Sequence, residues 1–481
     1  MAGPCPLPPR TAPASRPLGR PADHLDLDLP EQPPADWPNR FLAAFGRRLE
    51  RYRSFKLCLD LCVGCGACAE ACPLYQTTSD PMVSPAAMIA LARRVYARFF
   101  TAAGRIGSAL SRRALLTEEF LNHLFDRFHQ CLTCRRCALF CPLGLDPSEV
   151  ALAGREILAE TGLTASGLSG PAAAQVRTGN PFGFTAEDLL QACADLEQRI
   201  FQETGLAVRL PVDETRAEVM LLVPAADIFT NPEVMITYAK TLHAAGIRWT
   251  ISTRAAEADN PGYLLGYRHM KRLGRGIVEA AQDLEPRGLV WGEAGLGWRV
   301  ARSFLDTLTG PLSGLGFLGT GRPRHITELT ADLIRRGAFA GKLDPEVNGR
   351  RLFTYHDPCQ AARGAGLFDP PREVLRSAVL EFREMRPDAV REMTLCCGGG
   401  GGRNGLGPEY WSAGRPRAEA FRDSGAQALA TICHVCRMVL PAVLKAHIER
   451  EAPVFSVMEL FGRALTPYLT GLTLKDEPAI I

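Results

Sequence analysis

The segment Cys396-Cys397-Gly398-Gly399-Gly400-Gly401-Gly402 places two adjacent thiols directly before a glycine run. Three more cysteines accompany it, since Cys359 lies upstream and Cys433 and Cys436 lie downstream. A structural zinc site takes four ligands at tetrahedral geometry, so a fifth thiol beside a fourth is poor zinc chemistry. Soft thiolates are also the ligands of iron–sulfur clusters, and glycine lets backbone N–H groups approach inorganic sulfide closely. The five thiols therefore predict an iron–sulfur cluster held by three separated segments.

Two further cysteine runs, nearer the N-terminus, share the spacing Cys-x-x-Cys-x-x-Cys-x-x-x-Cys-Pro. This is the ligand run of bacterial ferredoxins, in which three closely spaced thiolates bind one cubane [4Fe–4S] cluster and the fourth reaches the other cluster. The doubled run and its trailing proline argue against a zinc module. We therefore assign one cubane cluster to Cys62, Cys65, Cys68 and Cys141, and the other to Cys131, Cys134, Cys137 and Cys72.

Besides Cys5 in the N-terminal tail, two cysteines fall outside these patterns. Cys58 precedes the first run, and Cys193 shares an apolar helical stripe with Leu189, Leu196 and Ile200. A free cysteine packs as a small hydrophobic residue. We therefore predict that both are core residues and not ligands.

Bulk composition describes an ordinary globular chain. Its 481 residues are enough for two or three domains with full cores, and the formal charge of +3 argues neither for nor against nucleic acid. The most apolar C-terminal stretch, from Val454 to Leu474, is interrupted by Glu459 and Arg463, so no membrane-spanning segment is predicted. Sixteen cysteines without an export signal indicate a reducing compartment, where thiols bind metal instead of pairing.

The patterning divides the chain into four parts, with a mixed α+β and α/β fold class. Residues 1–40 are rich in proline and poor in large apolar groups, so we predict a disordered tail. Residues 41–205 show helical periodicity around the two cysteine runs and predict a helical ferredoxin domain with two [4Fe–4S] clusters. From Ala217 short apolar runs alternate with helical patterns, which predicts α/β structure for residues 206–345 and 346–481.

The two α/β parts repeat one order of elements. Strands are predicted at Val219 to Val223, Trp249 to Ser252 and Leu289 to Trp291, and again at Leu352 to Tyr355, Met393 to Leu395 and Ala428 to Ile432. The matched positions are Pro224-Ala225 with Pro358-Cys359, Ala294 with Cys433, and Gly297 with Cys436. We therefore predict a duplicated α/β unit whose first copy carries no cluster ligands.

The five-thiol pattern resembles the cysteine-rich "CCG" domain of heterodisulfide reductases. The residues that carry the resemblance are Tyr355-His356-Asp357-Pro358-Cys359, Cys396-Cys397-Gly398 and Ile432-Cys433-His434-Val435-Cys436. In that family the motif holds a noncubane [4Fe–4S] cluster at which disulfides are cleaved. The resemblance implies a third, noncubane cluster in the last α/β part, bound at Cys359, Cys396, Cys397, Cys433 and Cys436 as the catalytic site.

Reduction of a disulfide also needs protons. His356 and His434 lie close to the cluster cysteines in the sequence, and histidine titrates near neutral pH, so either could donate a proton. A histidine beside a cluster can equally hydrogen-bond a sulfide. Both residues are candidates for the catalytic site on this reasoning.

Over nearly its whole length the chain resembles the DsrK family, the heterodisulfide-reductase-D-like subunits of a membrane complex (DsrMKJOP) of dissimilatory sulfite metabolism. Stretches that carry the resemblance include Tyr52-Arg53-Ser54-Phe55, Gln130 to Cys137 and Trp291-Gly292-Glu293. It implies a catalytic subunit that exchanges electrons between the quinone pool and a protein disulfide or trisulfide. The implied partners are a DsrM-like membrane cytochrome b, a DsrC-like sulfur-carrier protein and other complex subunits, with no nucleic acid.

This resemblance also implies a cytoplasmic location, peripherally bound to the inner membrane through partner subunits. The sequence departs from those relatives at Ala294 and Leu296, where they have a cysteine and a histidine. The departure argues against a contribution of the first α/β copy to cluster binding or proton delivery.

Two other functions share some of these features. Iron–sulfur subunits of flavin-dependent 2-hydroxy acid (glycolate, lactate) or glycerol-3-phosphate dehydrogenases combine a ferredoxin domain with a CCG domain and only carry electrons. No flavin fingerprint occurs in this sequence, so that function needs a flavin partner. A zinc-stapled interaction protein is contradicted by the paired ferredoxin runs.

Overall fold

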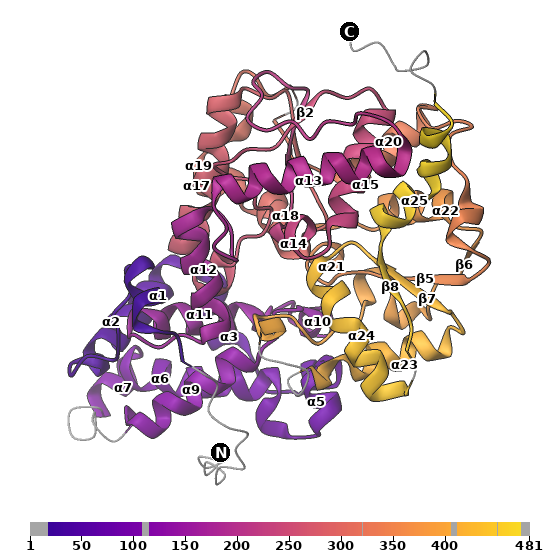
Figure 1. Cartoon of the computed structure of the whole chain (residues 1–481). Helices are drawn as coiled ribbons and strands as arrows, with labels where there is room; N and C mark the ends of the chain where they lie inside the picture. Colours follow the sequence, from indigo (N-terminus) through magenta and orange to yellow (C-terminus); the bar gives the residue numbers. More distant parts are fainter. Residues whose placement is uncertain (1–17, 108–114, 320, 406–410, 450, 473–481) are drawn as a thin grey trace.

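The computed structural model describes residues 18–107, 115–319, 321–405, 411–449 and 451–472. A helical region that carries both ferredoxin runs lies beside two parallel β-sheets, each covered by helices (Figure 1). This arrangement confirms the predicted fold class. The boundaries proposed at residues 205 and 345 stay predictions, although the last helix before the first sheet ends at Thr204 and the second sheet begins at Leu352.

The helical region is built around one buried helix. α11 (Pro147–Glu160) contacts α2, α3, α6 and α9, and its side chains are buried on nearly every face, as at Val150, Ile157 and Leu158. Asp146 caps its N-terminus by accepting a hydrogen bond from the Ser148 amide. The helices of this region are α1 (Pro21–Asp26), α2 (Trp37–Arg51), α3 (Arg53–Leu61), α4 (Ala67–Ala71), α5 (Pro73–Thr78), α6 (Pro85–Phe99), α7 (Ala102–Gly107), α9 (Glu118–Gln130), α10 (Arg136–Leu139), α11, α12 (Ser166–Thr178) and α13 (Ala186–Thr204).

Residues 18–40 are folded, so the predicted disordered tail is wrong for that stretch, while residues 1–17 lie outside the described residues. Helix α1 packs on α12, and Leu27 is buried. The buried His24 ring contacts the Thr164 hydroxyl at 2.6 Å and the Pro30 carbonyl at 2.8 Å. The composition argument failed here because polar contacts to α12 and its preceding loop anchor a segment that has few large apolar residues of its own.

Two four-stranded parallel sheets follow, with the same strand order. The first has the order β2-β1-β3-β4 and the second β6-β5-β7-β8. The apolar strand β1 is buried on both faces, as expected of a parallel sheet covered by helices. The strands are β1 (Val219–Leu222), β2 (Trp249–Thr250), β3 (Leu289–Trp291), β4 (Arg324–His325), β5 (Leu352–His356), β6 (Glu381–Phe382), β7 (Ala428–Thr431) and β8 (Val454–Ser456). The duplicated α/β architecture is therefore confirmed.

Helices connect and cover these strands. Those of the first unit are α14 (Ala225–Phe229), α15 (Pro232–Ala244), α16 (Gly262–Leu265), α17 (Tyr267–Leu284), α18 (Gly295–Ser303), α19 (Leu305–Thr309) and α20 (Ile326–Arg335). Those of the second are α21 (Ala362–Ala365), α22 (Asp369–Ala378), α23 (Arg415–Asp423), α24 (His434–Ile448) and α25 (Val457–Thr470). Short 3₁₀ helices lie at Pro81–Val83, Leu312–Gly314, Pro345–Asn348, Pro387–Ala389, Arg391–Met393, Arg403–Gly405 and Ser412–Gly414.

The two units share one hydrophobic core. Buried residues of both sheets belong to it, among them Leu221 and Val290 of the first and Phe353 of the second. Helix α25 of the second unit packs on α15 of the first, where an added Cβ at Gly462 would lie 2.4 Å from Thr237 Oγ1. The units are therefore fixed relative to each other by close packing.

One predicted strand is wrong. Met393 to Leu395 has no strand, since Arg391–Met393 forms a 3₁₀ helix. The strands that pair with β5 are β7 and, on its other side, β6, which precedes this segment. A strand here would need its backbone carbonyls to accept hydrogen bonds from a neighbouring strand. Arginine side chains donate to two of these carbonyls instead, Arg136 to that of Met393 and Arg363 to that of Thr394. The short strands β4, β6 and β8 were not predicted.

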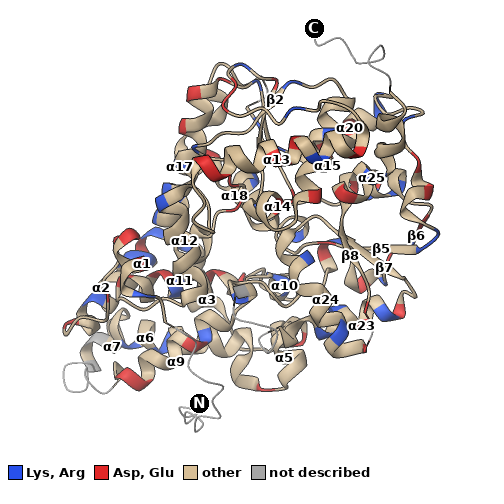
Figure 2. Cartoon of the chain, in the orientation of Figure 1, with Lys and Arg blue, Asp and Glu red and all other residues tan. Residues whose placement is uncertain are grey.

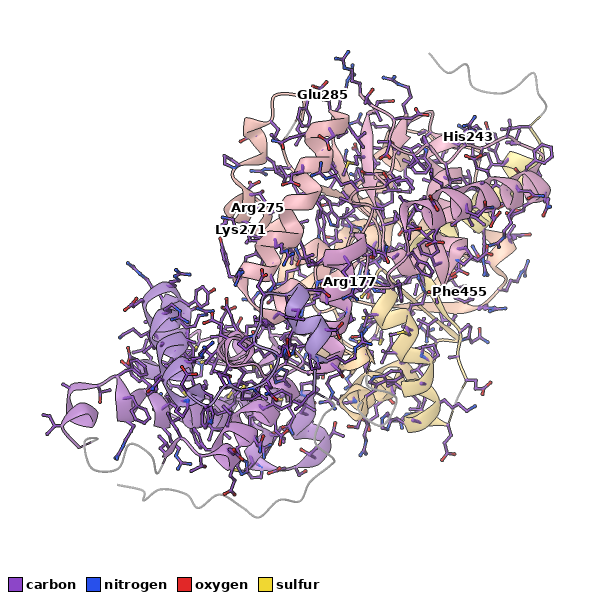
Figure 3. The ribbon with its side chains drawn as sticks, turned by 60° about the vertical axis from the view of Figure 1, so that its left-hand side comes forward. Arg177, His243, Lys271, Arg275, Glu285 and Phe455 are labelled. Atoms are coloured by element: carbon purple, nitrogen blue, oxygen red, sulfur yellow. The ribbon has the colours of Figure 1, made fainter. Side chains whose placement is uncertain are left out.

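Charge is mixed over the molecule, as Figure 2 shows for lysine and arginine against aspartate and glutamate. Arg177 on α12 and Lys271 and Arg275 on α17 lie near the junction of the helical region with the first sheet (Figure 3). Among the described residues, no helix is both long and apolar enough to cross a membrane.

Candidate iron–sulfur sites

The first pocket of the helical region is lined by Cys62, Cys65, Cys68 and Cys141, the four cysteines assigned from the spacing to one cubane. The loop between α3 and α4 turns at Gly64 and Gly66, which have φ of +70° and +81°. Arg93 holds this loop from α6, donating to the Cys62 and Leu59 carbonyls at 2.6 Å each. The structure thus brings these four thiols together as predicted, and Cys65 is exposed.

A second pocket is lined by Cys72, Cys131, Cys134 and Cys137, the other predicted set. Cys72 reaches it from the junction of α4 and α5, and the remaining three follow the end of α9. The fully buried Arg155 supports the loop from α11, donating to the Phe128 carbonyl at 2.9 Å and to the Cys131 carbonyl at 2.5 Å. Arg155 was not predicted, and only its place on the buried helix α11 could have indicated its role.

The five remaining candidate ligands meet at the ends of strands in the second α/β unit. Cys359 follows β5, Cys396 and Cys397 lie in the irregular segment after β6, and Cys433 and Cys436 lie at the start of α24 after β7. Parallel strands end at one edge of a sheet, which is why segments so distant in sequence converge. All five side chains are buried.

Their thiols lie within hydrogen-bonding distance of one another. Hydrogen bonds from Cys396 and Cys436 lower the pKa of Cys397 well below its usual range. A hydrogen bond from Cys436 lowers the pKa of Cys433 to about 6. Hydrogen bonds and burial raise the pKa of Cys359 and that of Cys436 well above the usual range. Five sulfur atoms that meet in one buried place are the soft donors that iron–sulfur clusters bind, so the donor set fits the predicted cluster.

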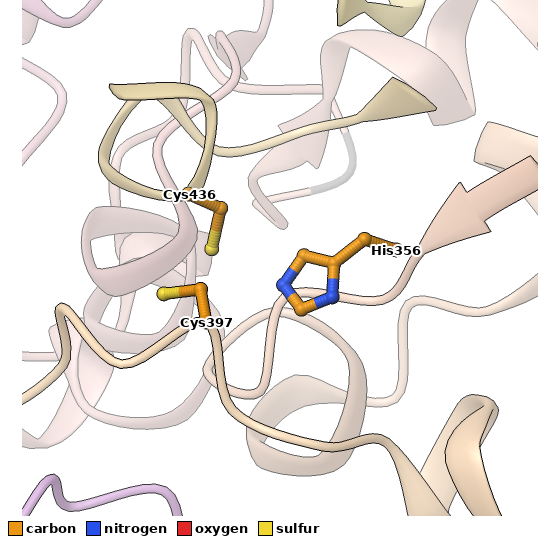
Figure 4. A group of neighbouring side chains, drawn as sticks. All are labelled: His356, Cys397 and Cys436. Atoms are coloured by element: carbon orange, nitrogen blue, oxygen red, sulfur yellow. The ribbon is translucent and has the colours of Figure 1, made fainter. Parts of the chain in front are cut away.

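His356 also faces this set. Its ring nitrogen and the sulfur atoms of Cys397 and Cys436 all lie within 4.8 Å of one another (Figure 4). The ring is fully buried, and neither nitrogen has a hydrogen-bond partner among the described residues. Burial, and then the Arg417 charge, lower the pKa of His356 well below its usual range. His356 is therefore a neutral imidazole beside the thiols.

His434 differs in its surroundings. Its Nε2 lies 3.2 Å from a carboxylate oxygen of Asp259, and its backbone amide donates to the Glu293 carbonyl at 3.1 Å. Burial disfavours the charged ring, but the charges of Asp259, Cys433 and Asp227 outweigh burial and raise the pKa of His434. Two histidines that the sequence treats alike thus lie in opposite electrostatic environments.

The glycine run packs against the ferredoxin loop. An added Cβ at Gly400 would lie 2.6 Å from the Leu132 carbonyl oxygen, and one at Gly401 would lie 2.3 Å from that of Cys131. Gly401 also has φ of +65°. At the start of the run the Gly398 amide donates to the Cys396 sulfur at 3.4 Å, whereas Gly400 and Gly401 contact protein backbone. Glycine is needed at these positions because two backbones touch there.

The second pocket and the five-thiol site adjoin each other. The Cys134 and Cys396 thiols lie within hydrogen-bonding distance, and Cys359 belongs to the same buried cluster. Gln360 donates to the Thr133 carbonyl at 2.9 Å, and Arg363 donates to the Cys134 carbonyl at 2.5 Å. The sequence did not indicate these two bridging residues, although both closely follow Cys359.

The two cysteines predicted to pack do so. Cys58 is buried, and its sulfur donates to the Asp146 carbonyl at 3.5 Å. Cys193 is 4% exposed and lies in the core beneath the first sheet. Neither lines a cysteine pocket.

Comparison with known protein families matches two parts of the chain. Residues 58–145 match a family model described as a 4Fe-4S dicluster domain. Residues 353–441 match one described as a cysteine-rich domain, CCG. The matched ranges contain all thirteen cysteines that line the three sites.

Relatives match over most of the chain. The second iron–sulfur subunit of the Hdr-like menaquinol oxidoreductase of Archaeoglobus fulgidus is 33% identical over 95% of this chain and 87% of its own length. One subunit of the dihydromethanophenazine:CoB–CoM heterodisulfide reductase of Methanosarcina barkeri is 26% identical over 85% of this chain and 94% of its own. The EtfAB:quinone oxidoreductase of Syntrophomonas wolfei is 24% identical over 85% of this chain and 58% of its own.

Proposed function

Because the chain belongs to the family of heterodisulfide-reductase-like (Hdr-like) iron–sulfur subunits, we propose that it is the catalytic subunit of a membrane-associated complex. It is an iron–sulfur oxidoreductase subunit that binds 4Fe–4S clusters. In this proposal it exchanges electrons between the quinone pool and a disulfide or trisulfide on a sulfur-carrier protein, as members of the DsrK family do.

The observation that carries the proposal is the continuous series of cysteine sites. It starts at the exposed Cys65 of the first pocket, passes through the second pocket and ends at the buried five-thiol site. The contact between Cys134 and Cys396 joins the last two sites directly. A series of this kind suits electron transfer between a partner at the surface and a reaction inside.

The cysteines provide for three clusters. Cys62, Cys65, Cys68 and Cys141 hold one cubane, Cys72, Cys131, Cys134 and Cys137 hold the second, and Cys359, Cys396, Cys397, Cys433 and Cys436 hold a noncubane cluster. When bound, the cubanes supply electrons one at a time and the noncubane cluster supplies the site for two-electron sulfur chemistry. The backbone contacts of Arg93 and Arg155 keep the two ferredoxin loops in the shape that binding requires.

The chain also has to deliver protons, since R–S–S–R′ takes up two electrons and two protons to give R–SH and R′–SH. We assign proton donation to His434, because its ring is 16% exposed and is bonded to Asp259, which is 15% exposed. His356 has no such route among the described residues, so it serves as a neutral partner for cluster sulfur. Both histidines therefore belong to the proposed catalytic site in different roles.

The proposed partners follow from the DsrK resemblance. They are a DsrM-like cytochrome b that connects to quinone, a DsrC-like carrier of the trisulfide, and further complex subunits. The apolar side chains Leu61, Val63 and Leu143 are exposed around the first pocket and suit a subunit interface beside Cys65. The proposed location is the cytoplasmic face of the inner membrane, bound through these partners.

One observation favours a second candidate function. All five thiols of the last site are buried, so a sulfur on a carrier protein has to enter on an extended segment. An electron-transfer subunit of a flavin-dependent 2-hydroxy acid or glycerol-3-phosphate dehydrogenase needs no such access. In that case the five-thiol site only relays electrons to or from the partner.

The test replaces one ligand that the other two sites do not share. We expect Cys397→Ser to lower the iron content of anaerobically purified protein from about twelve to about eight atoms per chain. Viologen-driven reduction of the cubanes, followed optically, should persist, whereas reduction of a carrier trisulfide or a small disulfide should stop. Retained turnover would refute the catalytic assignment, and loss of cubane reduction would refute the separation of the sites.

A further inference from the structure

The first α/β unit contains a closed counterpart of the five-thiol site. Pro224-Ala225 follows β1 as Pro358-Cys359 follows β5, and Ala294 caps α18 as Cys433 caps α24. The segment after β2 corresponds to the one after β6, which bears Cys396 and Cys397, because both strand orders agree. In the first unit this segment contains Glu257 and Asp259.

The loop from Glu257 to Asp259 occupies the place in the first unit that corresponds to the five-thiol site of the second. An added Cβ at Gly297, the position that matches Cys436, would lie only 1.9 Å from the Ala258 carbonyl oxygen. The Glu257 carboxylate accepts hydrogen bonds from the amides of Ala225, at 3.0 Å, and Asp259, at 2.7 Å. Protein atoms therefore fill the place that a cluster would need.

Contacts from three other elements hold the loop in this position. Gln175 of α12 donates to the Asp259 carbonyl at 2.9 Å, and the Trp291 indole donates to the Ala258 carbonyl at 3.2 Å. The Gly297 amide at the start of α18 donates to the Asp259 carboxylate at 2.9 Å. With backbone and one carboxylate oxygen both fixed, the second carboxylate oxygen has a defined direction.

The second carboxylate oxygen of Asp259 contacts the second α/β unit, which contains the five-thiol site. Oδ2 of Asp259 lies 3.2 Å from Nε2 of His434, in the first turn of α24 between Cys433 and Cys436. The start of α18 also touches this turn, since an added Cβ at Gly295 would lie 3.1 Å from the Cys433 sulfur. The other ring nitrogen, Nδ1, is buried and has no hydrogen-bond partner among the residues that the structure describes.

We propose that Asp259 is a positioning residue for the sulfur-reducing site, in which a carboxylate from the cluster-free unit fixes the orientation and tautomer of the His434 ring. The proposal deepens the proposed function and rests on it. The Asp259 carboxylate accepts a hydrogen bond from Nε2–H, and Nδ1 is the ring nitrogen that no described residue contacts through a hydrogen bond. In this proposal the first unit contributes a carboxylate to the five-thiol site, although it has no cysteine or histidine at Ala294 and Leu296.

Partners that orient a functional histidine change activity by about 10- to 100-fold when removed. We therefore expect Asp259→Asn in the full-length, cluster-loaded chain to lower kcat for bis(2-hydroxyethyl) disulfide by about that factor, with KM unchanged. Reduced viologen serves as the electron donor. Asp259→Glu, which retains a carboxylate, should recover part of the loss.

The matched control is Asp213→Asn, the same change on a neighbouring exposed loop, where the carboxylate bonds Thr253 instead of a histidine. Asparagine also tolerates the positive φ of 54° at this position. The control should leave kcat and KM unchanged. A loss in both variants would mean that the effect is not specific to His434.

A second readout does not depend on turnover. In protein labelled with ¹⁵N-histidine, the nitrogen coupling of His434 to the paramagnetic five-thiol centre should be present, disappear in His434→Gln and change in Asp259→Asn. An unchanged coupling, or none in the unsubstituted protein, would overturn the proposal. If turnover is absent but the coupling changes as expected, the proposed function fails while the positioning role stands. If the Asp259→Asn protein loses iron, Asp259→Glu is tested in its place, by its kcat and by the nitrogen coupling of His434.

Discussion

The two α/β units share a strand order but differ at the ends of their strands. Both place four parallel strands in the same sequence of neighbours, and both continue from the last strand into a helix with a capping box, at His325 and Ser456. At the same edge, after the other strands, one unit has five thiols, and the other has the Glu257–Asp259 loop. The comparison teaches that apolar strands determine the architecture, whereas a few residues after them determine whether a cluster can bind.

The closure of the first unit involves more than missing ligands. Restoring cysteines at Ala225 and Ala294 would leave the Ala258 carbonyl in place against Gly297. The space itself is absent, and the loop that fills it is bonded to three elements of the structure. The first unit therefore offers no space for a cluster at this edge.

The largest stability effect should come from disturbing this closure. Gly297→Ala places a methyl group against the Ala258 carbonyl, and overpacking of this kind costs about 3 kcal/mol in the free energy of unfolding. Gly276→Ala on α17 is the control, because an added Cβ there meets nothing within 4 Å. That change should stabilise by about 0.5–1 kcal/mol. Equal denaturation midpoints for the two variants would show that the loop is not tightly packed.

The capping boxes differ in their response to pH. Burial lowers the pKa of His325 to about 3, so the folded state keeps this ring neutral while the unfolded chain protonates it below about 6.5. The contribution of the neutral His325 ring to the free energy of unfolding is therefore full above about pH 6.5 and decreases as the pH falls towards about 3. At pH 5 this contribution should be about 2 kcal/mol smaller than at pH 7.5. His325→Asn, which retains a capping side chain, should reduce that dependence.

The second unit supplies the control for this experiment. Ser456 caps α25 in the same way and carries no titratable group. Ser456→Asn should therefore leave the difference in unfolding free energy between pH 7.5 and pH 5 unchanged. If His325→Asn keeps the full dependence of the unsubstituted protein, the ring is not held neutral.

The smallest effect should come from a cysteine that lies away from the five-thiol edge. Cys193 packs beneath the first sheet, so Cys193→Ala should leave the iron content unchanged. Loss of its sulfur from the core should cost about 1 kcal/mol. Iron analysis and a denaturation curve check both parts, and loss of about four iron atoms would make Cys193 a ligand.

Several features could be read from the sequence because their physical causes are local. The ferredoxin spacing predicts which thiols share a pocket, since closely spaced cysteines and one distant cysteine are all that the cubane geometry needs. Strands β5 and β7, with five and four residues, were predicted from the mostly apolar runs Leu352 to Tyr355 and Ala428 to Ile432. The duplication is visible for the same reason.

Other features depend on contacts between distant segments. Strands β4 and β6 have two residues each, too short for a periodicity, and the contact of Arg136 and Arg363 with the Met393 to Leu395 backbone replaces a predicted strand. The tail prediction failed because α1 is held by α12. These outcomes depend on which partner is nearby, and composition carries no information about that.

The chemistry of the sites divides in the same way. Thirteen cysteines and two histidines were identified from the sequence, because metal-binding residues recur at spacings that the metal imposes. Only the tertiary structure distinguishes the buried His356, which has no hydrogen-bond partner among the described residues, from His434 beside Asp259. Only it brings Cys134 to Cys396. A ligand spacing is a property of one segment, whereas a pKa, a hydrogen-bond partner and an electron route arise from segments that meet only when the chain folds.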